Sequence, residues 1–352
     1  MERTPLLQKK ETLVQLGNIF NSIVNEQQWP GYSIGINDKE YNDFKSLLPA
    51  LKNHNGWFSY DMIVLALSAW SNMLKIDCLN DWLNKYSFDY DSSNKTVAII
   101  CAGNIPMVGF HDVLCGYLSG HSLMIKLSSD DSLLIPAIVE LMSNYDNNIL
   151  DQISFVTTKL KGFDAVIATG SNNTSRYFND YFGKYPNIIR QSRTSVAVLN
   201  GNETENDLME LAKDVFSYYG LGCRNVTKLF LPKGFDLDKI FKGFFHMKEI
   251  VNNNKYANNY DYYKAIFLLE KFEIIENGFI VLKEDKSLFS PIGTLYYEYY
   301  NELEQVNELL VKEQSQIQCK VGSNGVSFGK AQEPNLWDYA DQIDTMSFLN
   351  NI

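Results

Sequence analysis

Between residues 96 and 199 the chain alternates short, uninterrupted apolar runs with stretches of helical periodicity. The apolar runs cover residues 97–101, 123–127, 153–157, 164–168 and 196–199, and the helical patterns between them cover 108–119, 132–143 and 172–182. An apolar run without polar alternation is typical of a strand that is buried on both faces, and parallel strands need crossover connections of this kind. The alternation predicts a doubly wound α/β fold, in which ligands bind at the carboxyl ends of the strands.

Two further regions flank this alternation. Residues 1–95 have helical periodicity at 13–23, 41–51 and 59–74, and we expect them to pack on the first domain as a helical lead-in. After a turn-rich break at 200–203, helical patterns at 205–219, 236–245, 256–269 and around 299–312 are mixed with strand patterns at 228–231 and 279–282. We therefore divide the chain into a lead-in with a first α/β domain (1–200), a second α/β domain (201–330) and a C-terminal return segment (331–352), and we expect the active site in the cleft between the two domains.

Charge and composition exclude several classes of function. A net charge of −11 and a pI near 4.9 argue against a nucleic acid or an anionic membrane as the main partner. No apolar run approaches the ~20 residues that span a bilayer, and the N-terminal residues have no signal-peptide core, so we expect a cytoplasmic protein without a membrane span. The five cysteines form no C-x-x-C pair and the four histidines have no ligand spacing, so no metal site and no disulfide framework is predicted.

Cys223 differs from the other cysteines in its sequence context. It follows Gly220-Leu-Gly222 and precedes Arg224, between a predicted helix and a predicted strand. Glycines allow backbone amides to approach a reacting centre, and a neighbouring guanidinium favours the thiolate. The alternative interpretation is a buried structural thiol, which is the interpretation we adopt for Cys78, Cys101, Cys115 and Cys319.

Several segments in a fixed order carry a family resemblance over roughly residues 95–350. They are Cys101-Ala-Gly-Asn-Ile-Pro106, Leu123-Met-Ile-Lys-Leu-Ser-Ser129, Ala168-Thr-Gly-Ser171, Gly222-Cys-Arg224, Phe289-Ser-Pro291, Gly329-Lys-Ala-Gln-Glu-Pro334 and the tail from Trp337 to Phe348. In this order they resemble the aldehyde dehydrogenase superfamily, and more closely its LuxC-type acyl-CoA reductase branch. The resemblance implies an aldehyde dehydrogenase-like fold, with an NAD(P)-binding domain before residue 200 and a catalytic domain after it.

The resemblance also assigns roles in the reaction. It implies that Cys223 is the acyl-accepting nucleophile and that the amide of Asn104, with the backbone amide of Cys223, holds the oxyanion of the thioester intermediate. From the residues alone, Asn104 reads equally well as an ordinary turn residue. The substrate would be an acyl-CoA, with CoA as the leaving group and an aldehyde as the product.

The cofactor residues follow the strand ends. The resemblance implies that Lys126 binds the adenosine ribose or its phosphate, that Ser128 and Ser129 replace a glutamate that would bind the ribose hydroxyls, and that Phe289 belongs to the cofactor-binding residues. Gly170 and Ser171 precede a predicted helix whose N-terminus suits a pyrophosphate, although a plain N-cap explains the same residues. Without the carboxylate we favour NADPH, and NADH stays open because Asp130 and Asp131 follow. Lys126 also reads as a surface lysine.

Two departures from the family are informative. Hydrolytic aldehyde dehydrogenases have a glutamate general base in a Glu-Leu-Gly-Gly-Lys pattern, whereas residues 187–195 here contain no carboxylate. An acyl-cysteine would then persist until CoA exchanges with it, as an acyl-CoA reductase requires. Arg190 and Arg193 in this stretch read as phosphate ligands or as solvated arginines, and His111 reads as a satisfied core histidine or as a base near the cleft. Ser287 stands where a glutamate often precedes the Phe-x-Pro segment.

Two other functions stay open at this point. The chain could relay an acyl group through Cys223 to another enzyme without reducing it, or it could be a non-catalytic subunit of a multienzyme fatty-acid reductase complex. The resemblance allows an acyl-protein synthetase as a partner and a homo-oligomer as the assembly. The presence of Asn104, Lys126, Gly170 and Cys223 together favours the reductase.

Overall fold

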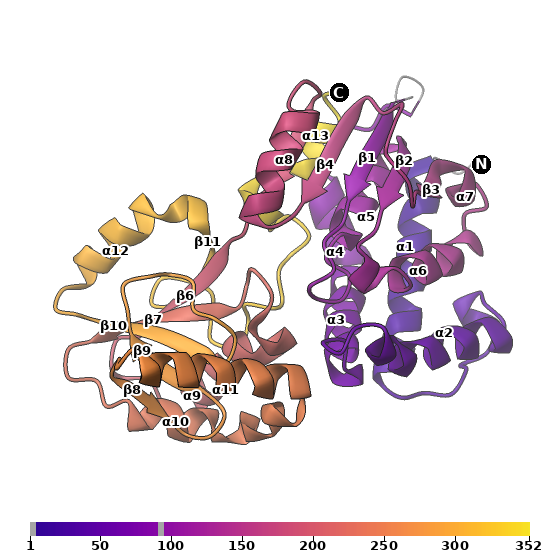
Figure 1. Ribbon diagram of the computed structural model, residues 1–352. Helices are drawn as coiled ribbons and strands as arrows, with labels where there is room; N and C mark the ends of the chain where they lie inside the picture. Colours follow the sequence, from indigo (N-terminus) through magenta and orange to yellow (C-terminus); the bar gives the residue numbers. More distant parts are fainter. Residues whose placement is uncertain (1–4, 91–94) are drawn as a thin grey trace. The chain divides into compact units, whose positions relative to one another are not determined.

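The computed structural model describes residues 5–90 and 95–352, and the chain forms two compact units (Figure 1). Unit 1 comprises Met1–Gln191 and Asn335–Ile352, and unit 2 comprises Ser192–Pro334. The C-terminal segment therefore belongs to the same unit as the N-terminal helices. The division falls between Gln191 and Ser192, a few residues before the boundary that we placed at residue 200.

Four helices precede the first sheet in unit 1: α1 (Pro5–Val24), α2 (Asp38–Ala50), α3 (Tyr60–Met73) and α4 (Ile76–Leu83). α1 packs along α3 and also contacts α5 and α6, so these helices share a core with the sheet. α2 begins with a reciprocal cap, in which the Asn37 side chain accepts from the Glu40 amide and the Glu40 carboxylate accepts from the Asn37 amide. Within residues 5–90 and 95–352 no single helix is long and apolar enough to cross a membrane, while α3 and α4 meet that test only as a bent pair.

The sheet of unit 1 has five parallel strands. They are β1 (Thr96–Ile100), β2 (Ser122–Lys126), β3 (Ile153–Phe155), β4 (Ala165–Thr169) and β5 (Asn187–Arg190), in the order β3-β2-β1-β4-β5. The connecting helices are α5 (Phe110–Ser119), α6 (Leu134–Ser143), α7 (Ile149–Gln152) and α8 (Asn172–Phe182). This order is that of a doubly wound sheet, as the apolar runs predict.

Helices cover both faces of this sheet. On one face Ala98 and Val166 share a core cluster with Phe178 and Phe182 of α8. On the other face α5 approaches β2 so closely that a Cβ on Gly116 would lie 2.5 Å from the Leu123 side chain. Only glycine allows this approach, which explains a glycine inside the helix despite its cost of ~1 kcal/mol.

Unit 2 contains a six-stranded sheet in the order β11-β6-β7-β10-β9-β8. All neighbouring strands are parallel except β8 and β9, which pair antiparallel. The elements are β6 (Thr194–Val198), α9 (Glu205–Phe216), β7 (Val226–Pro232), α10 (Asp238–Phe244), α11 (Asn254–Leu269), β8 (Ile274–Glu276), β9 (Val281–Glu284), β10 (Thr294–Tyr300), α12 (Leu303–Lys312) and β11 (Ile317–Gly322). α9 packs on β7, and α12 packs on β10.

Three strand predictions need correction. The run at 196–199 is not the fifth strand of the first sheet, because β6 pairs with β7 and β11 in unit 2. The fifth strand of unit 1 is β5. It ends in Arg190, which can be buried because it forms an ion pair with Asp112. The helix expected around 299–312 begins only at Leu303, because the tyrosine-rich segment before it forms β10, and β11 was not predicted.

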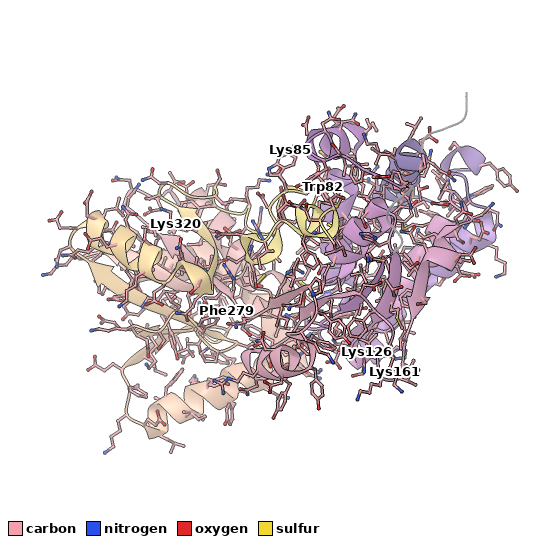
Figure 2. The ribbon with its side chains drawn as sticks, turned by 90° about the horizontal axis from the view of Figure 1, so that it is seen from above. Trp82, Lys85, Lys126, Lys161, Phe279 and Lys320 are labelled. Carbon is pink, nitrogen blue, oxygen red and sulfur yellow. The ribbon has the colours of Figure 1, made fainter. Side chains whose placement is uncertain are left out.

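The C-terminal segment is bound to unit 1 by side chains from the first half of the chain. His111 Nε2 lies 2.8 Å from the Leu336 carbonyl oxygen, and His121 Nε2 lies 2.9 Å from that of Leu349. The Trp82 indole donates to the Tyr339 hydroxyl at 2.8 Å, and Figure 2 shows Trp82 next to the yellow C-terminal segment. The last helix, α13 (Thr345–Leu349), packs on α5.

Candidate active site

Cys223 lies on a turn between α9 and β7. All five cysteines lie in the part of the chain that the structure describes, and Cys223 alone among them is exposed. The turn is closed by the Asn225 amide, which donates to the Gly222 carbonyl at 3.0 Å. The thiol therefore sits on a short, hydrogen-bonded loop at the amino end of a buried strand.

The side chain of Asn225 holds this turn from inside. Its Oδ1 accepts from the Gly222 amide at 2.8 Å, and its Nδ2 donates to the carbonyl oxygens of Ser217, Asp214 and Val215 at 2.8, 3.1 and 3.3 Å. Asn225 is fully buried. One amide thus joins the Cys223 turn to the carboxyl end of α9, whose last carbonyls have no partner within the helix.

The backbone between α9 and this turn is strained. Tyr218, Tyr219 and Gly220 have φ values of 51°, 58° and 79°, so three consecutive residues adopt the left-handed conformation. This conformation costs a residue other than glycine ~1–2 kcal/mol. The segment reverses the chain direction in very few residues, and the surrounding hydrogen bonds must offset the cost.

A second anchor comes from β6. The Ser195 hydroxyl donates to the Cys223 carbonyl at 3.0 Å, and the Ser195 amide donates to the Asn225 carbonyl at 3.1 Å. The same hydroxyl accepts from the Cys319 amide of β11 at 3.2 Å. Ser195 is fully buried, so both ends of the Cys223 turn are fixed to the central part of the sheet.

Asp214, on α9, ties the segment before Pro334 to the same region. Its carboxylate accepts from the amides of Gly329 and Ala331 at 2.7 and 2.9 Å, and the Arg224 guanidinium donates to the Ala331 carbonyl. Burial raises the pKa of Asp214 to about 6, although the two backbone amides lower it. The effect of Arg224 on the Cys223 thiolate stays a prediction.

The Phe289-Ser-Pro291 motif lies close to the Cys223 loop. A cavity of about 20 Å³ is lined by Tyr219 and Gly220 on one side and by residues 290–294 on another. Such a volume is enough for a single water molecule. Phe289 itself is 38% exposed, and its contact with a cofactor stays a prediction.

In unit 1 the loops that follow β1 and β2 are joined. A Cβ on Gly103, next to Asn104, would lie 2.8 Å from the Ser128 side chain, so the two loops are in close contact. The buried Asn55 amide donates to the carbonyls of Gly103 at 3.3 Å and Asp130 at 3.4 Å. The N-terminal helical region, in which Asn55 lies, therefore helps to shape the edge of the sheet that carries Asn104.

The expected cofactor residues after β2 have structural partners. Lys126, labelled in Figure 2, is the last residue of β2, is half-buried and donates to the Thr158 carbonyl at 3.3 Å. The Ser128 hydroxyl accepts from the Asp130 amide at 3.2 Å and caps a short 3₁₀ turn that begins at the exposed Ser129. Asp131 is buried and accepts from the Met107 amide at 3.1 Å, and burial raises its pKa to about 6.

Gly170 and Ser171 connect β4 to α8. The Ser171 hydroxyl accepts from the Thr174 amide at 3.3 Å and so caps the helix. A Cβ on Gly170 would lie 3.0 Å from the Phe178 ring, which explains the glycine by close packing. Because β1, β2 and β4 are parallel, this turn lies at the same edge of the sheet as Asn104 and Lys126.

The structure gives the partners of three other residues whose interpretation was open. His111 is half-buried beside the rings of Trp70, Trp82 and Tyr339, and desolvation lowers its pKa, which fits a satisfied core histidine. Arg190 is neither solvated nor open to a phosphate, because it forms a buried ion pair with Asp112. The Arg193 guanidinium donates to the carbonyls of Gln314 and Ile317 at 3.4 and 3.3 Å.

A family model described as "Acyl-CoA reductase (LuxC)" matches residues 48–240, which is more than half of the chain. The chain belongs to the LuxC acyl-CoA reductase family. The matched region includes both Asn104 and Cys223, as well as the strand ends with Lys126 and Gly170. A comparison with curated protein sequences gives no match.

Solved structures show the fold of this LuxC-family chain. Aldehyde dehydrogenase 21 from Physcomitrella patens is 12% identical, with a TM-score of 0.60 over 88% of this chain and 73% of that one. A putative aldehyde dehydrogenase from Burkholderia cenocepacia is 10% identical, with a TM-score of 0.62 over 91% and 74%. The Mycobacterium tuberculosis aldehyde dehydrogenase complexed with NAD+ is 13% identical, with a TM-score of 0.56 over 88% and 72%. At such identities the likeness establishes an aldehyde dehydrogenase-like fold alone.

Several residues that shape the site of this LuxC-family chain were not found from its sequence. Asn225 and Ser195 hold the Cys223 turn. In unit 1, Asn55 bonds the loop that carries Asn104, and Asp112 forms the ion pair with Arg190. A weak signal existed for two of them, because Gly222-Cys-Arg-Asn225 has the composition of a turn and Ser195 directly precedes the apolar run at 196–199. Among the residues that the structure describes, no three His, Cys, Asp or Glu side chains group to hold a metal ion.

Proposed function

We propose that this LuxC-family chain is an NAD(P)H-dependent acyl-CoA reductase that works through a thioester on Cys223. The observation that supports this most is the exposed Cys223 on a turn that Asn225 and Ser195 fix from two sides. A nucleophile of this kind must be accessible while its backbone stays in place, since an oxyanion donor acts only where it is pre-oriented. The family supports a reaction of acyl groups.

The proposed reaction has two half-reactions. The Cys223 thiolate attacks the carbonyl carbon of the acyl-CoA thioester, the bond from that carbon to the CoA sulfur breaks, and CoA leaves as a thiol after it takes up a proton. The Asn104 side-chain amide and the Cys223 backbone amide stabilise the oxyanion, and such a donor contributes ~3–4 kcal/mol. A bound reduced nicotinamide would supply the hydride for the acyl carbon. The thiohemiacetal on Cys223 would then lose its hydroxyl proton and break its carbon–sulfur bond, which releases the aldehyde and regenerates the Cys223 thiolate.

The cofactor residues of unit 1 fit a dinucleotide in their chemistry. Lys126 offers an ammonium group at a strand end, and the turn Gly170-Ser171 offers the positive end of α8, whose first turn has no acidic residue. Three solved structures of the same fold were determined with NAD+. On this proposal Lys126, Ser128 and Ser129 bind the adenosine ribose, Gly170 and Ser171 bind the pyrophosphate, and Phe289 contacts the cofactor.

NADPH is the proposed cofactor rather than NADH. Asp131 is buried and accepts from the Met107 amide, so of the two aspartates after Ser129 only Asp130 is exposed. A 2′-phosphate would meet Lys126 and two serines rather than a carboxylate. An acyl-protein synthetase partner and a homo-oligomer stay predictions from the resemblance, and a cytoplasmic location stays a prediction from the composition.

One assay separates the reductase from both alternatives. Purified protein is mixed with a long-chain acyl-CoA and NADPH, and the loss of NADPH, the release of CoA and the formation of aldehyde are followed together. The reductase consumes NADPH in step with aldehyde formation. An acyl-transfer protein would release one equivalent of CoA and leave NADPH unchanged, and a non-catalytic subunit would do neither.

A further inference from the structure

Asn225 lies two residues after the proposed nucleophile and is the most heavily hydrogen-bonded side chain of the Cys223 loop. Its amide side chain makes four bonds, one accepted from Gly222 and three donated to carbonyls at the end of α9. Its own carbonyl accepts from the Ser195 amide. No contact of this kind follows from the family resemblance.

We propose that Asn225 is a positioning residue for the reaction, which fixes the direction of the Cys223 backbone amide and thiol. The inference rests on the proposed role of Cys223. Asn225 does not touch the substrate on this view. It acts through the turn, because the Gly222 amide that it holds belongs to the peptide unit just before Gly222, and its own backbone amide closes the turn onto Gly222.

Only an amide side chain satisfies this environment. Three buried carbonyl oxygens converge on Nδ2, and each loses ~1–3 kcal/mol when its donor is removed. A carboxylate of the same shape would still accept from Gly222 but would place a negative oxygen against those three carbonyls. Asn225→Asp is therefore an isosteric change. It keeps the bond accepted from the Gly222 amide and replaces the three donated bonds with repulsion between oxygens.

The strained backbone next to the turn makes the position sensitive. Tyr218 and Tyr219 keep their left-handed conformation between two segments that Asn225 joins, the end of α9 and the turn at Gly222. When the Nδ2 bonds are lost, this segment can relax toward ordinary backbone angles. A small rotation of the peptide before Cys223 then turns its N–H away from the oxyanion, while the thiol stays exposed.

The test compares two reactions of the same sulfur. Acylation by acyl-CoA needs both the thiolate and an oriented oxyanion donor, whereas alkylation by iodoacetamide needs the thiolate alone. For Asn225→Asp we expect single-turnover acylation, measured as CoA release, to slow by about 10–100-fold, a part of the loss expected when an oxyanion donor is removed. Alkylation should change by less than about threefold, and the dissociation constant for NADPH should not change.

Asn277→Asp is the matched control, because it makes the same chemical change at a half-buried turn of unit 2, where Oδ1 also accepts from backbone amides. It should react like the wild type in both assays. If Asn225→Asp does not fold, Ser195→Ala is the alternative. It removes the hydroxyl that donates to the Cys223 carbonyl without adding a charge, and a selective loss of acylation is again expected.

The inference is overturned if Asn225→Asp acylates at the wild-type rate, or if it loses acylation and alkylation equally. If only Ser195→Ala folds, wild-type acylation by that variant overturns it. Cys223→Ala distinguishes this failure from that of the proposed function. If Cys223→Ala still takes up the acyl group, the proposed nucleophile is wrong. If Cys223→Ala is inert and Asn225→Asp acylates normally, only the role of Asn225 is refuted.

Discussion

The carboxylate of Asp112 on α5 forms a buried ion pair with the guanidinium of Arg190, the last residue of β5. The same guanidinium donates to the Thr345 hydroxyl at 2.9 Å, so it also binds the C-terminal segment. Burial alone would lower the pKa of Arg190, but the Asp112 carboxylate outweighs this effect and the pKa lies above its usual value. In the stretch where hydrolytic relatives have a glutamate base, this chain has a structural cation.

We expect Arg190→Met to destabilise the protein strongly. The substitution leaves the Asp112 carboxylate buried without its charged partner, and breaking a buried pair in this way costs ~3–5 kcal/mol. Urea unfolding measures the loss. The double variant Asp112→Asn with Arg190→Met should recover a large part of it, because no unpaired charge is left. A loss below about 1 kcal/mol for Arg190→Met would contradict the assignment of a structural ion pair.

Cys223→Ala should abolish both aldehyde formation and labelling by radioactive acyl-CoA, because the substitution removes the only proposed acyl acceptor. Binding of NADPH should not change, since the residues proposed to bind the cofactor, Lys126, Gly170 and their neighbours, lie elsewhere in the chain. Cys78→Ala is the matched control, because Cys78 is a half-buried thiol of α4. Acyl labelling that survives in Cys223→Ala would identify another nucleophile.

The first sheet was predictable because its central strands β1 and β4 are buried on both faces. β1, β2 and β4 have continuous apolar sequences, and this pattern is rarely produced by anything except a parallel strand or a buried helix. β5 escaped prediction because it is short, alternates between buried and half-buried residues, and ends in Arg190. β10 escaped because tyrosines occur in helices and strands alike, so Tyr299 and Tyr300 at its end fitted the helical pattern predicted around 299–312.

The candidate site was only partly predictable for a different reason. Asn104, Lys126 and Gly170 lie at or just after the carboxyl ends of three adjacent strands, β1, β2 and β4, and the parallel order places such residues at one edge. Ser195, which also holds the Cys223 turn, could not be found in this way, because its bonding partner is distant in the sequence. Ser195 precedes Cys223 by 28 positions, and no periodicity connects the two. Their relationship exists only after β6 and β7 pair.

The cofactor preference can be tested and reversed. We expect a preference for NADPH over NADH of about tenfold or more in kcat/KM, which corresponds to ~1.4 kcal/mol. Ser129 is exposed at the start of its 3₁₀ turn, so Ser129→Glu adds a carboxylate there without disturbing the Ser128 cap, and it should favour NADH. Lys126→Ala should weaken NADPH more than NADH. Equal use of both cofactors by the wild type would refute the preference and direct attention to Asp130.

Asp131 should make stability depend on pH. Its pKa is about 6 in the folded protein, because burial disfavours the charged form, and close to 4 in an unfolded chain. The folded state therefore holds this proton more tightly, and its contribution to stability falls as the pH rises from about 4 to about 6. The two-unit difference corresponds to ~3 kcal/mol. Asp131→Asn does not titrate and can still accept from the Met107 amide.

Urea unfolding of both proteins at about pH 4.5 and about pH 7 measures this contribution. Relative to the wild type, Asp131→Asn should gain stability between the two pH values. Asp207→Asn is a useful contrast, because hydrogen bonds from Thr204 lower the pKa of Asp207, so that variant should not gain stability as the pH rises. A difference between Asp131→Asn and the wild type that stays constant with pH would show that Asp131 does not titrate in this range.

The last prediction concerns water. Residues 187–195 offer no carboxylate, Arg190 is held by Asp112, and His111 is half-buried beside aromatic rings, where desolvation lowers its pKa. The acyl-Cys223 intermediate should therefore hydrolyse slowly when reduced cofactor is absent. A positioned general base accelerates such a step by ~100–10,000-fold, so the intermediate should persist long enough for its mass to be measured.

In the reverse direction, aldehyde and oxidised cofactor should turn over more than once only when CoA is added, because CoA is then the sole nucleophile able to release the acyl group. Free acid and acyl-CoA are measured separately. Rapid formation of free acid without CoA would mean that another group activates water. The first suspect would be Asp341. Its carboxylate accepts at 3.4 Å from the amide of Gln191, which lies in the stretch 187–195. Asp341→Asn would then stop the hydrolysis, and the protein would be an ordinary aldehyde dehydrogenase.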